Sequence, residues 1–544
     1  MKKSLIYGLS ALTLVASTMS LTSCIEETEP TNSATTSQVQ QSSSATEALL
    51  MAIPAYSTAK YFSGRYDWAF GYGALMYIRD IQSSDVCATD DAGYYQFSYF
   101  AENKYAGRDY VFAQYLYNYQ TKFVNTTNNV ISAVNPENAT DIQKGYLGAA
   151  YAYRALLYLD MAREYEYLPT DGTEPKSPYG NDVAGLTIPI VTEKTTESEA
   201  RDNKRATREE MKEFIKSDLD KAAEYIPMLD KTTKTLPHLD CVYGLYARLY
   251  MWVEDYANAE KYARMAINEY KGKPMTQEES LNTTTGFNDL SKWMWGAQDT
   301  KESLWNNLAN WASMVSNETS YGYAGGGGCN NMLDRRLYER LSNTDWRKLE
   351  WKAPAGSALD GQNMYVDDAL GKSLADYSGL KFRPNGGVVA PFSVASATAF
   401  PMMRVEEMYL IEAEAAAHQD PARGKQLLET FVKTYRDASY TCKVSDKDAV
   451  VEEIVFHKRI ELWGEGQSFF DLKRLNYSST RGYEGTNHLD QQRFNSNGRP
   501  AWMNWVISAN EEEGNVQVKE NNNTDPRRRP PAGRPTCAPS FPRR

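Results

Sequence analysis

The chain is poor in the residues that carry most metal and catalytic chemistry. Its 544 residues include only four His and six Cys. No CxxC pair and no HExxH pair occurs, which excludes the common zinc-ribbon, thioredoxin-type and zincin motifs. The glycine run at 325–328 lacks the Lys-Ser/Thr of a phosphate-binding P-loop. We therefore predict no cofactor. A structural Ca²⁺ in an Asp-rich loop stays open, although no motif supports it.

An excess of positive charge is also missing. The 59 Lys and Arg against 70 Asp and Glu give a net charge of −11. An acidic chain argues against a nucleic-acid partner. The exception is the Arg- and Pro-rich segment 525–544, which we predict to be a disordered tail.

Long apolar runs are absent outside the N-terminus. There, Lys2 and Lys3 precede an apolar stretch at 5–19, which has the length of a signal peptide and is too short to span a membrane. The following Leu-Thr-Ser-Cys24 matches a lipobox. We predict a lipoprotein signal peptide at 1–23, and then an acylated Cys24 with a flexible tether at 24–48. Several acyl chains would anchor the protein stably.

Helical periodicity dominates from residue 49 onward. Apolar residues recur at i, i+3, i+4 and i+7 over 239–253 and again over 259–270, with a short break between. Thr207 with Glu210 forms a capping box, and Asp420 with Pro421 gives an N-cap and a first-turn proline. These patterns predict a mostly α fold of tetratricopeptide-like helix hairpins in an α-α superhelix. Long irregular loop insertions interrupt it at 80–105 and 272–400.

Four features in the expected order resemble the SusD/RagB family. They are the lipobox, the helix in 141–170, the block PMMRVEEMYLIEAEA at 401–415, and RIELWGEG at 459–466 followed by FFDLKR at 469–474. The departures are Ser468, where the family often has Arg, and the tail. The resemblance implies a SusD-like body at 49–524 and a non-enzymatic, glycan-binding lipoprotein of the outer membrane. It also implies delivery of glycan to a SusC-like TonB-dependent barrel. Residues 25–29 resemble the acidic signal that directs Bacteroidetes lipoproteins to the cell exterior.

The charged residues of these blocks allow two interpretations. Glu461 and Glu465 lie four residues apart, as paired carboxylates of a glycoside hydrolase could. The neighbouring cations favour a buried ion-pair clamp instead, and the resemblance agrees. The predicted structural residues are Arg404, Glu407, Arg459, Glu461, Glu465, Asp471 and Arg474.

Aromatic residues are abundant, with 38 Tyr and 11 Trp. A sugar ring offers a C–H face for stacking and a hydroxyl rim for polar groups, so a glycan site should combine rings with Asp, Asn and Gln on loops. The ligand-binding candidates are Tyr94, Tyr95, Tyr99, Asn103, Trp293, Trp295, Trp305, Trp311 and Tyr321. Peptide or other nutrient cargo, a protein-binding scaffold and a hydrolase remain the alternatives.

Overall fold

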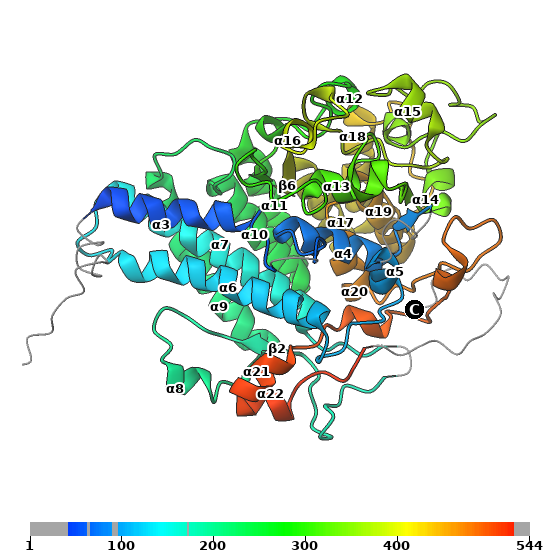
Figure 1. Ribbon diagram of the computed structural model, residues 1–544. Helices are drawn as coiled ribbons and strands as arrows, with labels where there is room; N and C mark the ends of the chain where they lie inside the picture. Colours follow the sequence, from blue (N-terminus) through cyan, green and yellow to red (C-terminus); the bar gives the residue numbers. More distant parts are fainter. Residues whose placement is uncertain (1–41, 63–65, 90–95, 171–172, 527–544) are drawn as a thin grey trace, which may run out of the picture.

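The structure is a computed structural model that describes residues 42–62, 66–89, 96–170 and 173–526. It is mostly helical, as predicted from the periodicity (Figure 1). The predicted signal peptide, Cys24 and the tail from 527 onward lie outside the described residues. Helix α3 (Ser43–Tyr56) begins within the segment predicted as a flexible tether, and the Ser42 side chain caps it by accepting from the amide of Ala45. The tether prediction is therefore wrong for its last residues.

A frame of long helices forms the body. It consists of α3, α4 (Tyr72–Ser83), α6 (Val111–Ala133), α7 (Asp141–Tyr165), α9 (Arg208–Tyr225), α10 (Leu239–Trp252), α11 (Tyr256–Tyr270), α17 (Val405–Gln419), α18 (Pro421–Tyr435) and α19 (Lys447–Glu461). The predicted capping box of Thr207 and Glu210 is present at the start of α9. Asp420 ends α17 and caps α18, where Pro421 is the first residue.

Two helix hairpins stack although a long insertion separates them in the sequence. Helix α10 packs on α11, and α17 packs on α18. Helix α11 also packs directly on α17, so the chain leaves the stack after Tyr270 and returns at Val405. The insertion therefore projects from the frame without breaking it, as expected for tetratricopeptide-like pairs.

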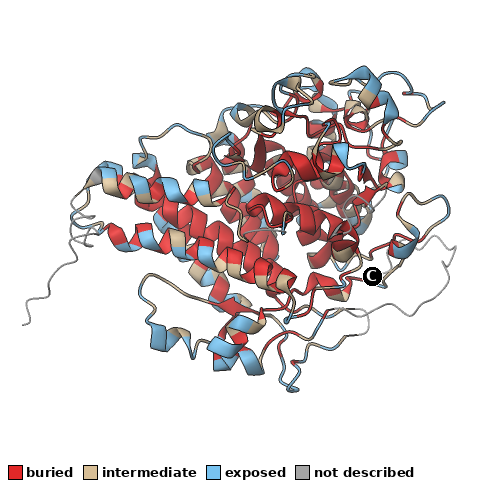
Figure 2. Cartoon of the chain, viewed as in Figure 1, coloured by how far each residue is buried: buried red, intermediate tan, exposed pale blue. Residues whose placement is uncertain are grey.

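Helix α7 is the centre of the frame. It contacts α3, α6, α9 and α10, and its residues are buried from Gly145 to Tyr165 (Figure 2). Two glycines make its tight crossing with the single turn η1 (Ile226–Met228) possible. A Cβ on Gly145 or Gly148 would lie 2.5 Å from the backbone of Leu229 or Ile226. A larger residue at either position would force α9 and η1 away from α7.

Within the described residues, three short antiparallel pairs of strands complete the frame. The pairs are β1 (Val86–Ala88) with β5 (Asn331–Leu333), β2 (Leu186–Pro189) with β3 (Arg205–Thr207), and β4 (Trp295–Gln298) with β6 (Ala399–Met403). The last pair joins the two ends of the insertion, with Gln298 opposite Ala399. This pair of strands closes the base of the loop 299–398. Strand β4 and the first two residues of β6 lie in the segment 272–400, which was predicted to be irregular.

The remaining elements are short and lie mostly in the insertion and near the C-terminus. They are α5 (Gln96–Ala101), α8 (Glu197–Ala200), α12 (Gln277–Leu281), η2 (Leu290–Lys292), α13 (Trp311–Val315), η3 (Gly322–Gly326), α14 (Arg335–Arg340), η4 (Trp346–Glu350), α15 (Asp368–Ser373), η5 (Asn385–Gly387), α16 (Phe392–Ala395), α20 (Ser468–Arg474), η6 (Asp490–Gln492), η7 (Ala501–Met503), α21 (Ala509–Gly514) and α22 (Val516–Glu520). Among the helices described, none combines the length and the apolar character that crossing a bilayer requires.

Candidate functional site

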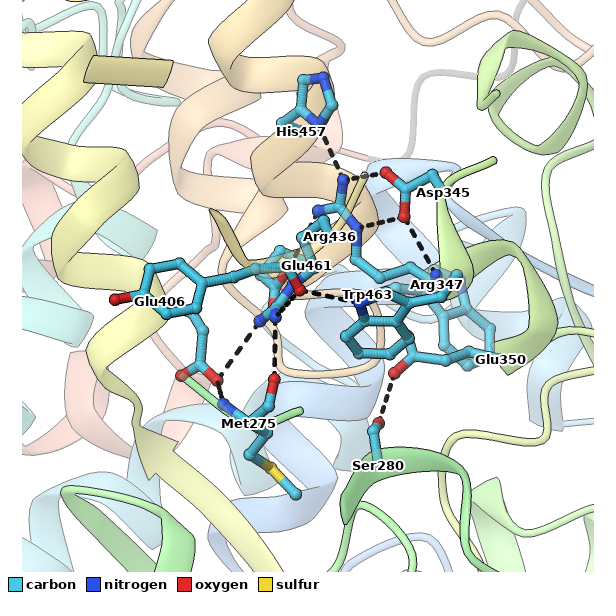
Figure 3. Close-up of polar contacts among 12 residues, drawn as sticks. Met275, Ser280, Asp345, Arg347, Glu350, Glu406, Arg436, His457, Glu461 and Trp463 are labelled. Atoms are coloured by element: carbon cyan, nitrogen blue, oxygen red, sulfur yellow. Dashed lines mark hydrogen bonds and ion pairs between the residues drawn. The ribbon is translucent and has the colours of Figure 1, made fainter. Parts of the chain in front are cut away.

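The charged residues of the two late sequence blocks lie in a buried network centred on Glu461. Its carboxylate accepts hydrogen bonds from Arg436 at 2.8 Å, Arg347 at 3.0 Å and Arg404 at 3.2 Å. Figure 3 shows Arg347, Arg436 and Glu461 of this network, with Arg436 also reaching Glu406 and the carbonyl of Met275. Burial opposes ionisation of Glu461, but Arg436 and the other two arginines hold its pKa well below the usual range. Glu461 is therefore a fixed anion.

The other block residues make ion pairs of the same kind. Glu465 pairs with Lys381 at 2.7 Å and with Arg404 at 2.8 Å. Pairs also join Glu407 to Arg248, Arg459 to Asp85, and Arg474 to Asp471 and Glu414. These contacts tie α17 to α10 and α20, and they tie α19 to the segment between α4 and β1. A general acid for glycoside hydrolysis needs a raised pKa and access to substrate, and Glu461 has neither.

Three of the predicted ligand-binding tryptophans are in the hydrophobic core. Trp293, Trp295 and Trp311 are 0% exposed. Trp295 is in β4, and its indole N–H donates to the Tyr153 hydroxyl of α7 at 3.3 Å. Trp311 opens α13 and packs on Phe400 with ring centroids 5.2 Å apart. Their prediction as ligand contacts is wrong, because strand pairing returns this part of the insertion to the interior.

The other predicted ligand-binding residues, apart from Trp305, are buried, half-buried or outside the described residues. Asn103 is buried and accepts a hydrogen bond from Gln82 at 2.9 Å, so it is also corrected to a packing residue. Tyr99 is half-buried against Tyr105, with ring centroids 4.4 Å apart. Tyr321 is half-buried, and its hydroxyl is 2.7 Å from that of Ser396. Tyr94 and Tyr95 lie outside the described residues.

Trp305 is the predicted candidate whose ring faces solvent. Its side chain is 60% exposed, on the loop between β4 and α13. Neighbouring residues come from the segment between α3 and α4 and from η3. We call this surface the Trp305 patch and define it as Lys60, Tyr66, Asp67, Trp305, Asn306 and Tyr323.

Asp67 joins the three segments of the Trp305 patch. Its carboxylate accepts from the Tyr323 hydroxyl at 3.0 Å and from the Asn306 amide at 3.5 Å. Lys60 pairs with the same carboxylate at 3.5 Å, and its ammonium lies 5.2 Å from the centroid of the Trp305 ring. These contacts hold the indole beside a cation, a carboxylate and an amide.

Tyr66 supplies a second exposed ring, at 39%. It contacts Phe62 at 5.1 Å and Trp68 at 5.8 Å between ring centroids, and Trp68 is buried. The exposed phenol is therefore supported from below by packed rings. Lys60, Tyr66 and Asp67 were not among the residues predicted from the sequence. Their signal was the density of aromatic residues around the Ser-Gly-Arg at 63–65, within a break in helical periodicity.

A Cys-His-Asp arrangement elsewhere does not form a nucleophilic triad. The same His488 nitrogen, Nε2, lies 3.3 Å from Cys87 Sγ and 3.2 Å from Asp334. A triad needs the nucleophile and the acid on opposite ring nitrogens. Burial also raises the pKa of Cys87 well above its ordinary value, which keeps the thiol protonated. In the part of the chain that the structure describes, no group of three or more His, Cys, Asp or Glu is placed to hold a metal ion.

Comparison with known proteins agrees with the fold. The family model described as "Starch-binding associating with outer membrane" matches residues 79–251, and that of the SusD family matches residues 346–528. A search of curated proteins found no significant match.

Solved structures share the fold over nearly their whole length. A SusD-like carbohydrate-binding protein from Bacteroides vulgatus has a TM-score of 0.67 and 20% identity, covering 89% of this chain and 98% of its own. A SusD superfamily protein from Bacteroides thetaiotaomicron has a TM-score of 0.64 and 18% identity, covering 88% and 98%. A SusD superfamily protein from Bacteroides fragilis has a TM-score of 0.62 and 18% identity, and the match covers 88% of this chain and 98% of its own. These structures show the fold. The two family models together span most of the helical frame and show that the chain belongs to the SusD family.

Proposed function

We propose that this protein binds glycan at the Trp305 patch and catalyses no reaction on it. The observation that carries the proposal is the exposed Trp305 indole, held beside Lys60, Asp67 and Asn306. An indole stacks on the C–H face of a sugar, and an amide such as that of Asn306 can pair with its hydroxyls. The side chains of Lys60 and Asp67 are only 6% and 14% exposed, so their main role is to hold the indole in place. Each ring contributes ~0.5–1.5 kcal/mol beyond burial, so an affinity of roughly micromolar to millimolar is expected.

Several observations support binding without hydrolysis. Glu461 and Glu465, the paired carboxylates of the late block, are buried and neutralised by arginines and a lysine. One of the similar structures, from Bacteroides vulgatus, is described as a carbohydrate-binding protein. Incubation with the glycan that binds should therefore release no new reducing ends. Release that depends on Glu461 or Glu465 would favour the hydrolase.

The test is a glycan array followed by calorimetric titration of the best ligand. Replacement Trp305→Ala should weaken binding at least tenfold. Tyr179 is a matched control, because its ring is also 60% exposed but lies outside the Trp305 patch. Tyr179→Ala should leave the affinity unchanged. Equal affinities of the two variants would contradict glycan binding at this patch. Binding of peptides, with no glycan bound, would favour the alternative of peptide cargo.

We further propose that the protein is a lipoprotein, anchored through Cys24 to the outer face of the outer membrane. Here it would pass glycan to a SusC-like TonB-dependent barrel. The lipobox, the acidic residues after Cys24 and the outer-membrane description of one matching family model support this location. Labelled palmitate should be incorporated into the wild type and not into Cys24→Ser. Co-purification of a barrel from detergent-solubilised membranes tests the partner.

A further inference from the structure

A cavity with a strongly cationic wall lies inside the helical frame, and none of the residues of the Trp305 patch lines it. Its volume is about 40 Å³, counted as the space open to the centres of water molecules. One water needs roughly 10–15 Å³ of such space, so the cavity has room for more than one water or for one small polyatomic ion. Helices α7, α10, α17, α19 and α20 all contribute to the wall.

The wall carries more positive than negative charge. Its cations are Arg163, Arg208, Arg248, Lys458, Lys473 and Arg474, and its acids are Glu166, Glu407 and Asp471. Six minus three leaves +3. Asp160 and Glu414 lie behind the wall and pair with Arg163, Lys458 and Arg474. When the charges of Asp160 and Glu414 are included, the net charge around the cavity is still +1. Asp160 also pairs with Arg79, so it does not neutralise Arg163 alone.

Some hydrogen-bond donors in the cavity wall also have no acceptor. Arg248 Nη1 and Arg474 Nη1 are buried and make no hydrogen bond of normal geometry. The Lys473 ammonium donates to the carbonyls of Arg163 and Glu164, each at 2.8 Å, and forms no ion pair with the described residues. An ammonium has three donors, so two carbonyls leave one. Burial lowers the pKa of Lys473 well below its ordinary value. Burial also lowers the pKa of Arg163; the neighbouring Arg248 and Arg79 act in the same direction, and Asp160 opposes them.

We propose that this cavity binds one tetrahedral oxyanion, sulfate or inorganic phosphate, between Arg163, Arg248 and Arg474. Planar guanidinium groups match the oxygen spacing of such anions and are preferred over an ammonium for this task. Arg208 forms the mouth, since its side chain is 33% exposed while the others are buried. The bound anion would supply the missing negative charge and hold α7, α10 and α20 together.

Calorimetric titration of sodium sulfate, phosphate and chloride into the purified protein at low salt tests the proposal. Sulfate or phosphate should bind saturably with a stoichiometry of one, at least tenfold more tightly than chloride. Arg208→Gln should weaken that binding about tenfold. Arg201→Gln is the matched control, because Arg201 pairs with Glu197 on the exposed helix α8, outside the cavity. It should bind as the wild type does. Absence of saturable binding, or equal loss in both variants, overturns the proposal.

Two further measurements locate the anion. Crystals soaked in sodium selenate should show an anomalous selenium peak inside the cavity, whereas density for water alone would contradict the proposal. Sulfate should raise the Tm of the wild type and of Arg201→Gln more than that of Arg208→Gln. The comparison between variants matters because sulfate stabilises proteins generally by exclusion from their surfaces. Equal increases in Tm for the two variants would contradict a specific site.

Discussion

Two tryptophans of the insertion, Trp295 and Trp305, differ in solvent exposure and in the kind of element that carries them. Trp295 is 0% exposed and belongs to a strand that pairs with β6 against α7. Trp305 is 60% exposed and belongs to the loop that this strand pair closes. The strand pair holds the base of the loop in place, and the loop carries the ring that faces solvent. The residue that packs in the frame and the residue that we propose to contact glycan are thus only ten positions apart in the sequence.

The largest effect should come from breaking the frame at Trp295. Trp295→Ala would leave a cavity between β4 and α7 and remove the hydrogen bond to Tyr153, at a cost of ~3–5 kcal/mol in the free energy of unfolding. Urea denaturation followed by circular dichroism measures it. Trp305→Ala should change the same free energy by less than ~0.5 kcal/mol, because its ring is exposed. Similar losses in both variants would remove the distinction drawn between the two rings.

The next effect concerns the charges of the frame. Glu461→Gln leaves Arg347, Arg404 and Arg436 buried with one anion fewer, which should destabilise the fold by about 3 kcal/mol or more. Glu197→Gln breaks a pair whose side chains are 65% and 82% exposed, and should cost less than ~1 kcal/mol. Glycan affinity of the folded fraction of Glu461→Gln should equal that of the wild type. A selective loss of affinity would instead place Glu461 in the ligand site.

A smaller, pH-dependent effect is expected below the loop of Trp305. Burial raises the pKa of Asp299 to about 7, although the Trp311 amide and the Ser303 hydroxyl oppose the shift. The folded state therefore binds this proton more tightly than the unfolded state. The stabilisation is complete below the ordinary pKa of 3.8 and is lost as the pH rises towards about 7.

Asp299→Asn removes this titration while retaining an oxygen that can accept from the Trp311 amide. Relative to the wild type, the variant should gain on the order of 2–3 kcal/mol in unfolding free energy between pH 5 and pH 8. Urea denaturation at both pH values measures the change. A difference between the two proteins that does not vary with pH would show that Asp299 titrates normally.

The two tryptophans also show which features of the structure can be predicted from the sequence alone. Local signals predicted the hairpin of α10 and α11, the capping box of Thr207 and the proline start of α18, because each depends on residues within a few turns. The pairing of β4 with β6 is non-local, since Gln298 meets Ala399 across most of the insertion. Without that pairing, the sequence does not show that Trp295 is buried and Trp305 is exposed.

The smallest expected effect tests how the Trp305 patch is held together. Asp67→Asn keeps an oxygen for the Tyr323 hydroxyl but removes the ion pair with Lys60. Because Lys60 lies over the Trp305 ring, loss of the pair should loosen the indole and weaken glycan binding about five- to tenfold, or ~1 kcal/mol. The free energy of unfolding should change by less than this amount. Asp368→Asn, in an exposed pair with Lys372, is the control and should bind as the wild type does. If Asp67→Asn binds normally, Trp305 acts alone, and the polar neighbours only surround it.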